Sequence, residues 1–409
     1  MRIAIIAPPW VPVPPPAYGG TETVLDTLAR GLAAAGHEVL LYTTADSTCP
    51  VRRSWVFESA RGVGAAGAAA AELRHVLAAY EAVADYEVVH DHTLIGPVYA
   101  NRFPWLPVVT TDHGPFVGDL GPLYRAVSDR APVIAISHHQ ASRAAGVNLA
   151  GVVHHGVDLD RFAVGEGRGG YGLFLGRMHP DKGVHVAVRA ARASGMPLKI
   201  AAKMSESHEI SYFTERVKPL LGGDTEYIGE VGGAEKVRLL GEATCLLNPI
   251  GWPEPFGMVM VEALATGTPV VATHAGAAPE IVEHGVTGFL ADDLGELSAA
   301  LGKVAELDRQ ACRQAARQRF SAERMVAEHL AIYRDIAKGK NSAVFGPTDS
   351  ALPPNWILYP ANPTPAGAAS LTSNSLVGSR LREAGPALPD PEEPWVSKSR
   401  SPSGALPSS

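Results

Sequence analysis

The segment WPEPFGMVMVEALATGTPVVAT, residues 252–273, contains two glutamates with seven residues between them, Glu254 and Glu262. Two neighbouring carboxylates could act as general acid and base, ligate a metal ion or bind the hydroxyls of a polyol. Eight residues along one continuous helix would place them about 12 Å apart. The prolines and glycine around Glu254 instead predict a loop, followed by a helix that carries Glu262. Acid–base chemistry within the pair is therefore the weaker hypothesis.

The predicted helix begins near Gly257 and offers its N-terminus to a ligand. The backbone amides of Phe256, Gly257 and Met258 would point at an anion or a polyol, because amides at a helix N-terminus have no partner within the helix. Carboxylate oxygens accept hydrogen bonds and bind vicinal hydroxyls well. We therefore expect one acid to bind a sugar and the other a ribose.

Two cations follow a predicted strand in the segment FLGRMHPDKG, namely Arg177 and, five residues later, Lys182. Lys182 is the first lysine of the chain, since the 181 residues before it use arginine alone. A guanidinium fork and a compact ammonium on one loop suit a diphosphate whose charge grows as it leaves. A pair of solvated surface cations is the alternative.

Two glycines, Gly19 and Gly20, end the loop after the first predicted strand. Glycines there let a ligand approach backbone amides, and the following helix favours anions at its N-terminus. Thr21 is the expected N-cap of that helix. The prolines of PPWVPVPPPAYGG make this connection unusually long and stiff, which favours a functional role for Gly20 over a plain turn.

Two series of apolar runs and helical patterns must position these residues. The first series contains the runs RIAIIAP, HEVLLYTT, YEVVHDH, PVVTTDHG and PVIAISHH, several of which end in His, Asp or Ser. The second contains YGLFLGR, PLKIAAK, TEYIGE, TCLLNPI and TPVVAT. The alternation predicts an α/β protein with two doubly wound parallel sheets facing a central cleft. Ligands of such sheets lie beyond the carboxyl ends of the strands.

The stretch AVGEGRGG, Ala163–Gly170, suits an interdomain hinge. We therefore predict a first domain over residues 1–165 and a second over residues 166–338. Residues 339–409 are predicted to be disordered, because twelve prolines occur in the last 69 residues together with Ser, Gly and Ala.

The composition restricts the class of protein. With 409 residues, 46% hydrophobic and 19% charged, the chain is typical of a soluble globular protein. Its net charge of −7, without a Lys/Arg run, argues against nucleic acid or an anionic membrane as the main partner. The start, MRIAIIAPPW, predicts a buried strand rather than a signal peptide, and no apolar run approaches the ~20 residues of a transmembrane helix. Three cysteines without metal spacing indicate reduced thiols and a cytoplasmic location.

Three other patterns imitate functional motifs. GVGAAG, residues 62–67, fits a dinucleotide fingerprint but does not follow the first strand. DLD, residues 158–160, imitates a metal-binding motif, although a structural loop is the preferred interpretation. The adjacent histidines at 90–92, 138–139 and 154–155 make poor chelates, because neighbours on an extended segment point to opposite sides. We expect no metal.

EPFGMVMVE resembles the E-x7-E motif of retaining GT-B glycosyltransferases of family 4. Five further segments are similar to segments of this family and follow its order: GGTETVLDTLARGLAAAGHEV, HHGVDLDRF, LGRMHPDKG, YIGEVGGAEKVRLLGEA and EALATGTPVVATHAGAAPEIVEHGVTGFL. The resemblance covers Met1 to about Lys338, with a texture nearest to transferases of antibiotic-oligosaccharide assembly. One departure is HHGVD, where many relatives have Asn before the Gly.

The resemblance implies a GT-B fold and a nucleotide-sugar donor, bound mainly by the second domain and used without a metal or other cofactor. Glu254 would contact the hydroxyls of the donor sugar, and Glu262 the ribose. Arg177 and Lys182 would hold the diphosphate. The sugar would pass, with retention of configuration, to an acceptor hydroxyl.

Four more assignments come from the resemblance. Gly229 and Val231 would lie near the base, Gly20 near the phosphates or the acceptor, and His113, in TTDHG, near the reacting sugar. A GT-B phosphorylase or a nucleotide-sugar epimerase would share the fold, and a non-catalytic nucleotide-sugar-binding protein is the third alternative. No motif specifies the acceptor, the donor base and sugar, or the oligomeric state.

Overall fold

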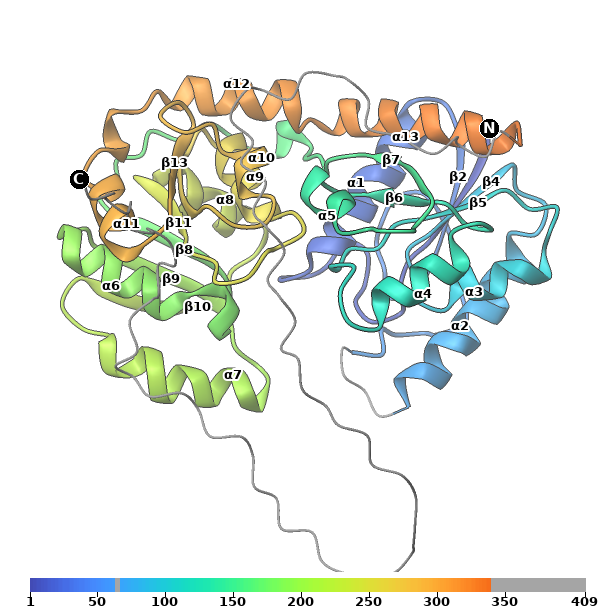
Figure 1. The fold of residues 1–409 in the computed structure, drawn as a ribbon, viewed down its shortest axis with the longest axis horizontal. Helices are drawn as coiled ribbons and strands as arrows, with labels where there is room; N and C mark the ends of the chain where they lie inside the picture. The colour runs from blue at the N-terminus through green and yellow to red at the C-terminus, as the bar shows by residue number, and fades with distance from the viewer. Residues whose placement is uncertain (63–66, 340–409) are drawn as a thin grey trace, which may run out of the picture. The chain divides into compact units, whose positions relative to one another are not determined.

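The chain folds into two α/β lobes, each built around a parallel sheet (Figure 1). The computed structural model describes residues 1–62 and 67–339. Residues 340–409 of the predicted disordered tail, and most of the GVGAAG segment, therefore lie outside the described residues. None of the described helices is both long and apolar enough to cross a bilayer.

The first sheet has seven strands in the order β3-β2-β1-β4-β5-β6-β7, and the second has six in the order β10-β9-β8-β11-β12-β13. All the ladders between the described strands are parallel. The strands of the first sheet are β1 (Arg2–Ile6), β2 (Glu38–Thr43), β3 (Arg52–Trp55), β4 (Val88–Asp91), β5 (Val108–Thr110), β6 (Val133–Ala135) and β7 (Leu149–Val152). Those of the second are β8 (Gly172–Arg177), β9 (Leu198–Lys203), β10 (Thr225–Gly229), β11 (Cys245–Asn248), β12 (Val270–Thr273) and β13 (Gly288–Ala291).

The predicted pair of doubly wound sheets is confirmed. Ten of the thirteen described strands coincide with the apolar runs, and the three that do not, β3, β7 and β13, are edge strands. β3, with the sequence RRSW, has no buried residue, so its pattern carries little hydrophobic signal.

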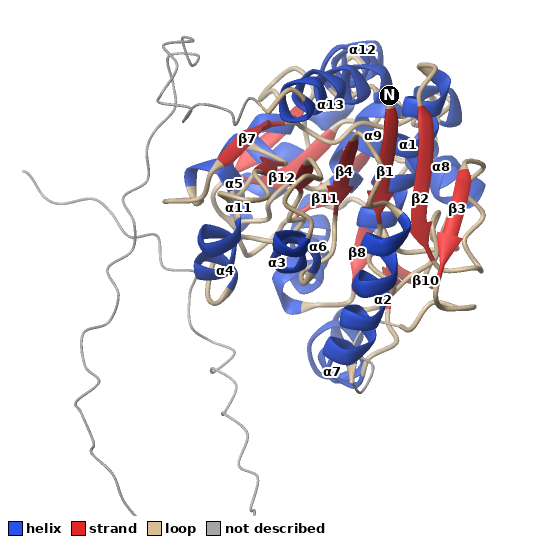
Figure 2. Ribbon diagram, turned by 90° about the vertical axis from the view of Figure 1, so that its right-hand side faces the viewer, coloured by secondary structure: helices blue, strands red, loops and turns tan. Residues whose placement is uncertain are grey.

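Helices cover both faces of the sheets (Figure 2). They are α1 (Gly20–Ala34), α2 (Ala68–Ala82), α3 (Gly96–Tyr99), α4 (Leu120–Val127), α5 (His138–Ser142), α6 (Val184–Ser194), α7 (Ser207–Tyr212), α8 (Gly233–Glu242), α9 (Met258–Ala265), α10 (Ala278–Ile281), α11 (Leu294–Leu301), α12 (Arg309–Arg319) and α13 (Ala322–Ala337). The start MRIAII forms β1, as predicted, next to β2 and β4.

Alternate residues of β1 serve different cores. Ile3 and Ile5 face α1, whereas Ala4 and Ile6 face α2 on the opposite side. All four side chains are fully buried. A strand buried on both faces needs a continuous apolar run, because successive side chains point to opposite sides.

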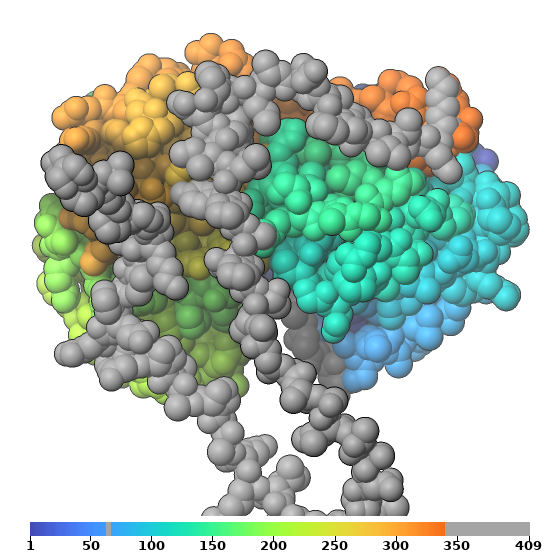
Figure 3. All heavy atoms as spheres, in the orientation of Figure 1, coloured from blue at the N-terminus to red at the C-terminus, as the bar shows by residue number. Residues whose placement is uncertain are grey.

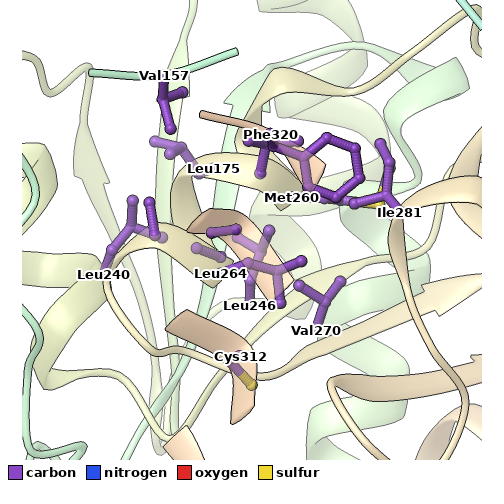
Figure 4. Close-up of a cluster of buried hydrophobic side chains, with 14 of the residues drawn as sticks. Val157, Leu175, Leu240, Leu246, Met260, Leu264, Val270, Ile281, Cys312 and Phe320 are labelled. Carbon is purple, nitrogen blue, oxygen red and sulfur yellow. The ribbon is translucent and has the colours of Figure 1, made fainter. Parts of the chain in front are cut away.

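The core of the second lobe joins its sheet to α9 and α12. Figure 4 shows Leu246, Leu264, Val270 and Cys312 among the buried side chains of this cluster. Their burial holds α9 against the sheet, so the direction of its N-terminus is fixed by the packing of the helix.

The last helix packs on the first lobe, although it follows the second lobe in sequence. α12 packs on α9, whereas α13 packs on α1 (Figures 1 and 3, both helices in orange). Met325, Leu330 and Tyr333 of α13 are buried in the same core as β1 and β2. Judged by packing, the second lobe ends near Phe320, before the predicted limit of 338. The sequence could not locate this boundary, because the apolar stripe of a helix does not specify which lobe the helix covers.

Helix α1 begins earlier than predicted. Its N-cap is Gly19, and Thr21 lies within the first turn rather than at the cap. A side chain at residue 19 would come within 2.6 Å of Pro15, so only glycine fits at this start. No side chain caps the helix, and its first amides are left available to a ligand.

We predict that Tyr333→Phe destabilises the first lobe. The Tyr333 hydroxyl lies 2.7 Å from Nδ1 of His90 in a fully buried position, and losing one partner of a buried hydrogen bond costs about 1–3 kcal/mol. Thermal unfolding should show a melting temperature lower by a few degrees. The matched control is Tyr99→Phe, since Tyr99 packs against another core, with its ring edge-on to Tyr80 at 5.7 Å between centroids. Equal melting temperatures for the two variants would contradict the assignment of α13 to this core.

Candidate active site

A cleft of about 580 Å³ lies between the two lobes. Arg177, Lys203 and Asn248 line it from the carboxyl ends of β8, β9 and β11. Ten of the eleven residues selected from the sequence line this cleft: Gly20, His113, Arg177, Lys182, Val231, Glu254, Phe256, Gly257, Met258 and Glu262. The eleventh, Gly229, ends β10 and is not part of the lining.

The loop that carries Glu254 is fixed through its backbone. The Gly251 amide donates to the Asp181 carbonyl over 2.8 Å, and the Thr273 hydroxyl donates to the Ile250 carbonyl over 2.6 Å. The Glu254 carbonyl accepts a hydrogen bond of 3.0 Å from the amide of Ala277. These bonds hold the loop against three neighbouring segments, so the Glu254 carboxylate is presented to the cleft from a rigid base.

Helix α9 starts directly after this loop, as predicted. Gly257, its N-cap, has φ 115°, a left-handed conformation that disfavours other residues. No side chain caps the helix. Phe256 is buried against the ring of His155 at 5.0 Å between ring centroids, which anchors the start of the helix to the first lobe. The residues at this end line the cleft, so their backbone amides are available to an anion or to hydroxyls.

Each of the two glutamates is paired with a lysine. Lys182 forms an ion pair with Glu254, and Lys236 forms one with Glu262 at 2.6 Å. Sequence reasoning missed Lys236, which lies on α8, because its 26-residue separation from Glu262 carries no periodic signal. The acids are therefore neither a close carboxylate pair nor isolated charges.

Arg177 is the cation of the cleft that has no ion pair among the residues the structure describes. It ends β8 beside Lys203, its register partner on β9, which is held by Glu206 and Glu209. An unpaired guanidinium in a cleft is suited to bind phosphate oxygens in a bidentate manner.

A column of histidines lines one side of the cleft and continues into the first lobe. His92 Nδ1 and His113 Nε2 are hydrogen-bonded at 3.0 Å, and His113 stacks on His155 at 5.2 Å between centroids. Behind His92 lies His90, whose ring is tilted by 43° against that of His92 at 3.9 Å between centroids and also contacts His329 of α13. The column links the last helix of the chain to the cleft.

Burial keeps these histidines neutral. It lowers the pKa of His113 and of His329 to about 4, and it moves the pKa values of His90, His92 and His155 well below 6.5. Neighbouring histidines further lower the pKa values of His90, His92, His113 and His155, because one imidazolium disfavours another. At neutral pH, His113 therefore acts as an uncharged hydrogen-bonding group.

Other features of the cleft were not selected from sequence. Glu22 of α1 lines it, and burial raises the pKa of this carboxyl. The proline-rich loop also crosses to the second lobe, where the Tyr18 amide donates to Glu230 over 3.0 Å. Glu22 and Tyr18 belong to a segment that the sequence indicated as functional, but neither residue was distinguished by its type or spacing.

One group of described residues, His138, His154 and Glu280, has the spacing of a metal site, with its potential ligand atoms within 4.8 Å of one another. The Glu280 carboxylate already accepts hydrogen bonds from the amides of His138 and His139 and from His154. Burial alone would raise the pKa of Glu280, but these bonds lower it. The group joins the two lobes outside the cleft lining and acts as a helix cap for α5.

The DLD segment forms a structural turn, as predicted. Asp158 accepts a hydrogen bond from the amide of Asp160 over 3.2 Å and begins a short 3-10 helix at Leu159–Arg161. All three cysteines are free and buried.

Two doubly wound α/β lobes with a cleft between them are the arrangement of the GT-B fold. Profiles of two sequence families match consecutive parts of the chain: Glycosyltransferase Family 4 over residues 18–161 and Glycosyl transferases group 1 over residues 160–319. The chain belongs to the family 4 glycosyltransferases.

Known relatives cover most of the chain. Phosphatidyl-myo-inositol mannosyltransferase of Mycolicibacterium smegmatis is 28% identical over 341 residues, covering 75% of this chain and 86% of the relative. D-inositol 3-phosphate glycosyltransferase of Mycobacterium marinum is 29% identical, with coverages of 87% and 91%. Among solved structures, a glycosyltransferase involved in avilamycin A biosynthesis superimposes with a TM-score of 0.64 at 25% identity, covering 83% of this chain and 98% of that one.

We predict that His329 contributes to the loss of stability in acid. An unfolded histidine titrates near 6.5 and His329 in the folded chain at about 4, so between these values the unfolded state binds the extra proton and stability falls as pH falls. In His329→Gln, the slope of unfolding free energy against pH should decrease by about one proton in this window. Urea denaturation from pH 7 to pH 4.5 measures the slope. An unchanged slope would contradict the prediction, and His208→Gln, on the surface, is the control.

Proposed function

We propose that this glycosyltransferase moves a sugar, with retention of configuration, from a nucleotide-sugar donor such as a UDP- or GDP-sugar. The acceptor is a hydroxyl of a glycan, a lipid or a small molecule, and no metal takes part. One observation carries the proposal: a single cleft is lined by the Lys182–Glu254 pair, by Arg177, which has no ion pair among the described residues, and by the uncapped N-terminus of α9. Within one site, the carboxylate can accept hydrogen bonds from sugar hydroxyls, and the cations and amides can donate hydrogen bonds to a diphosphate.

In the reaction, the bond between the anomeric carbon and the diphosphate breaks, and the electron pair leaves with the diphosphate. Arg177, Lys182 and the amides at the start of α9 stabilise the growing negative charge, a role that a metal ion fills in other transferases. The acceptor oxygen forms the new bond on the same face of the sugar, and the departing phosphate oxygen takes the acceptor proton.

The ion pairs support this same-face route. A carboxylate that is paired with an ammonium is a weakened nucleophile, and both Glu254 and Glu262 are paired. They serve instead to bind hydroxyls, Glu254 on the sugar and Glu262 on the ribose. His113, neutral near pH 7, positions a ligand oxygen rather than protonating it.

Solved structures support the donor class by analogy. A protein of the same fold from Anabaena was determined with UDP and glucose, with a TM-score of 0.63 and 20% identity to this chain. The named activities of the relatives above transfer sugars to different acceptors, so they do not select an acceptor for this chain. A cytoplasmic location, where nucleotide sugars and free thiols are both expected, completes the proposal.

The testing experiment measures thermal shifts of the full chain with UDP, GDP, ADP and TDP, each with and without EDTA. A nucleoside diphosphate that stabilises the protein equally with EDTA supports a metal-free diphosphate site. A shift that EDTA abolishes would contradict metal independence. No shift with any of the four would contradict the donor assignment. The nucleotide sugar of the diphosphate that stabilises the protein is then used as the donor. NMR of the product determines its anomeric configuration and so tests retention.

We predict that Glu254→Gln loses most transfer activity while the protein stays folded. Glutamine keeps the shape but loses the charge that binds hydroxyls and holds Lys182, so kcat/KM should fall about 100-fold or more. Lys182→Met should also slow transfer, and it should weaken binding of the nucleoside diphosphate.

A double-mutant cycle tests the pairing. Because the two side chains interact directly, the double variant Glu254→Gln/Lys182→Met should lose less activity than the product of the single losses. Lys218→Met, on the exposed side of the second lobe, is the control for loss of a lysine. Independent losses in the cycle would contradict a joint role, and unchanged kcat/KM in either single variant would contradict the role of that residue.

A further inference from the structure

Three buried polar atoms of one short stretch, residues 248–254, have no hydrogen-bond partner among the described residues. They are Nδ2 of Asn248, Nε1 of Trp252 and Oε2 of Glu254. All three residues line the cleft, and Asn248 is only 4% exposed. Ten such atoms occur in the described part of the chain, so three within seven residues is a concentration that needs a physical reason.

A backbone rearrangement of this stretch cannot supply the missing hydrogen-bond partners. Its backbone is tied to Asp181, Thr273 and Ala277 by the hydrogen bonds described above, and Asn248 is the last residue of β11. Leaving buried donors and acceptors unpaired costs folding free energy. A site that keeps them unpaired on a rigid base is preorganised for a ligand that pairs them.

The chemistry of the three atoms selects the ligand group. The indole and amide nitrogens only donate, whereas the carboxylate oxygen only accepts. A phosphate oxygen accepts but would leave Glu254 unpaired and repelled, and an ammonium donates but would leave both nitrogens unpaired. A hydroxyl does both, because it donates one hydrogen bond and accepts two.

We propose that Trp252 and Asn248 recognise hydroxyl groups of the transferred sugar, as hydrogen-bond donors that act together with Glu254. This rests on the proposed function, and it extends it to the class of sugar. The sugar keeps the hydroxyls that face this stretch, so donors that are deoxygenated there are poor substrates. A site built to pair a hydroxyl rejects an analogue without it strongly, because its own buried polar groups are then left unpaired.

The test compares the full chain with Trp252→Phe and Asn248→Ala. Trp252→Phe keeps an aromatic ring and removes only the N–H end of the indole. Its matched control is Trp105→Phe, since Trp105 is 67% exposed and donates to the Ala84 carbonyl away from the cleft. Asn101→Ala, at an exposed asparagine bonded to the Val98 carbonyl, controls for Asn248→Ala.

Calorimetry gives Kd values for UDP and UDP-glucose, and for GDP and GDP-mannose. We expect Trp252→Phe and Asn248→Ala to raise the Kd of the bound nucleotide sugar about tenfold, and to leave that of its nucleoside diphosphate within twofold. In the wild-type protein, a nucleotide sugar that lacks one of the recognised hydroxyls should bind about tenfold more weakly than the parent nucleotide sugar. The Trp252→Phe variant should bind the parent and this deoxygenated donor with equal affinity.

Three results separate the possibilities. If the variants leave the nucleotide-sugar Kd unchanged, or raise both Kd values equally, then Trp252 and Asn248 do not recognise the sugar and the inference is overturned. If they change only the melting temperature, the polar atoms have a structural role and the inference is also overturned. If the unchanged protein binds neither nucleoside diphosphates nor nucleotide sugars, the proposed function fails, and the sugar assignment falls with it.

Discussion

The reversal of strand order in each sheet determines where chemistry can take place. In the second lobe the order reverses between β8 and β11, and the helix after β8, α6, packs in a different core from the helix after β11, α9. The crevice beyond these strand ends is open because no connection covers it. Arg177 ends β8 and Asn248 ends β11, so the guanidinium and the buried amide stand at the two sides of one crevice. The loop with Glu254 and the N-terminus of α9 complete it.

Among the Lys and Arg side chains that line the cleft, all but Arg177 have a carboxylate partner within the described residues before any ligand arrives. Lys182 and Lys236 are each neutralised by a glutamate, so the site does not hold a cluster of unpaired like charges. A diphosphate would compete with Glu254 for Lys182, and a hydroxyl would compete with Lys182 for Glu254. The diphosphate of a nucleotide sugar therefore suits Lys182, and the hydroxyls of its sugar suit Glu254. Neither partner has to be buried alone when the cleft is empty.

Local pattern predicted the elements that hold the site. The prolines, the glycine and the apolar run around Glu254 and Glu262 were enough to place one acid in a loop and the other in a helix, because turn and helix signals act over a few residues. The start of α1 was misplaced by the Gly19–Gly20 pair, since the contact with Pro15 that requires glycine is visible only in the fold.

The parts that were not predicted depend on contacts between distant residues. Lys236 pairs with Glu262 across 26 positions, and the histidine column joins residues 90, 92, 113, 155 and 329. The return of α13 to the first lobe is of the same kind. An amphipathic stripe shows that a helix is half-buried, but the partner is selected by shape in three dimensions.

The return of α13 has a consequence for the order in which the protein is made. Synthesis proceeds from the N-terminus, and domains generally fold as units while the chain emerges. The core around β1 and α1 lacks Met325, Leu330 and Tyr333 until the whole second lobe has been synthesised. The first lobe is therefore the first to be translated and the last to be completed. During that interval α1, β4 and β5 lack the apolar side of α13 that packs on them in the finished protein.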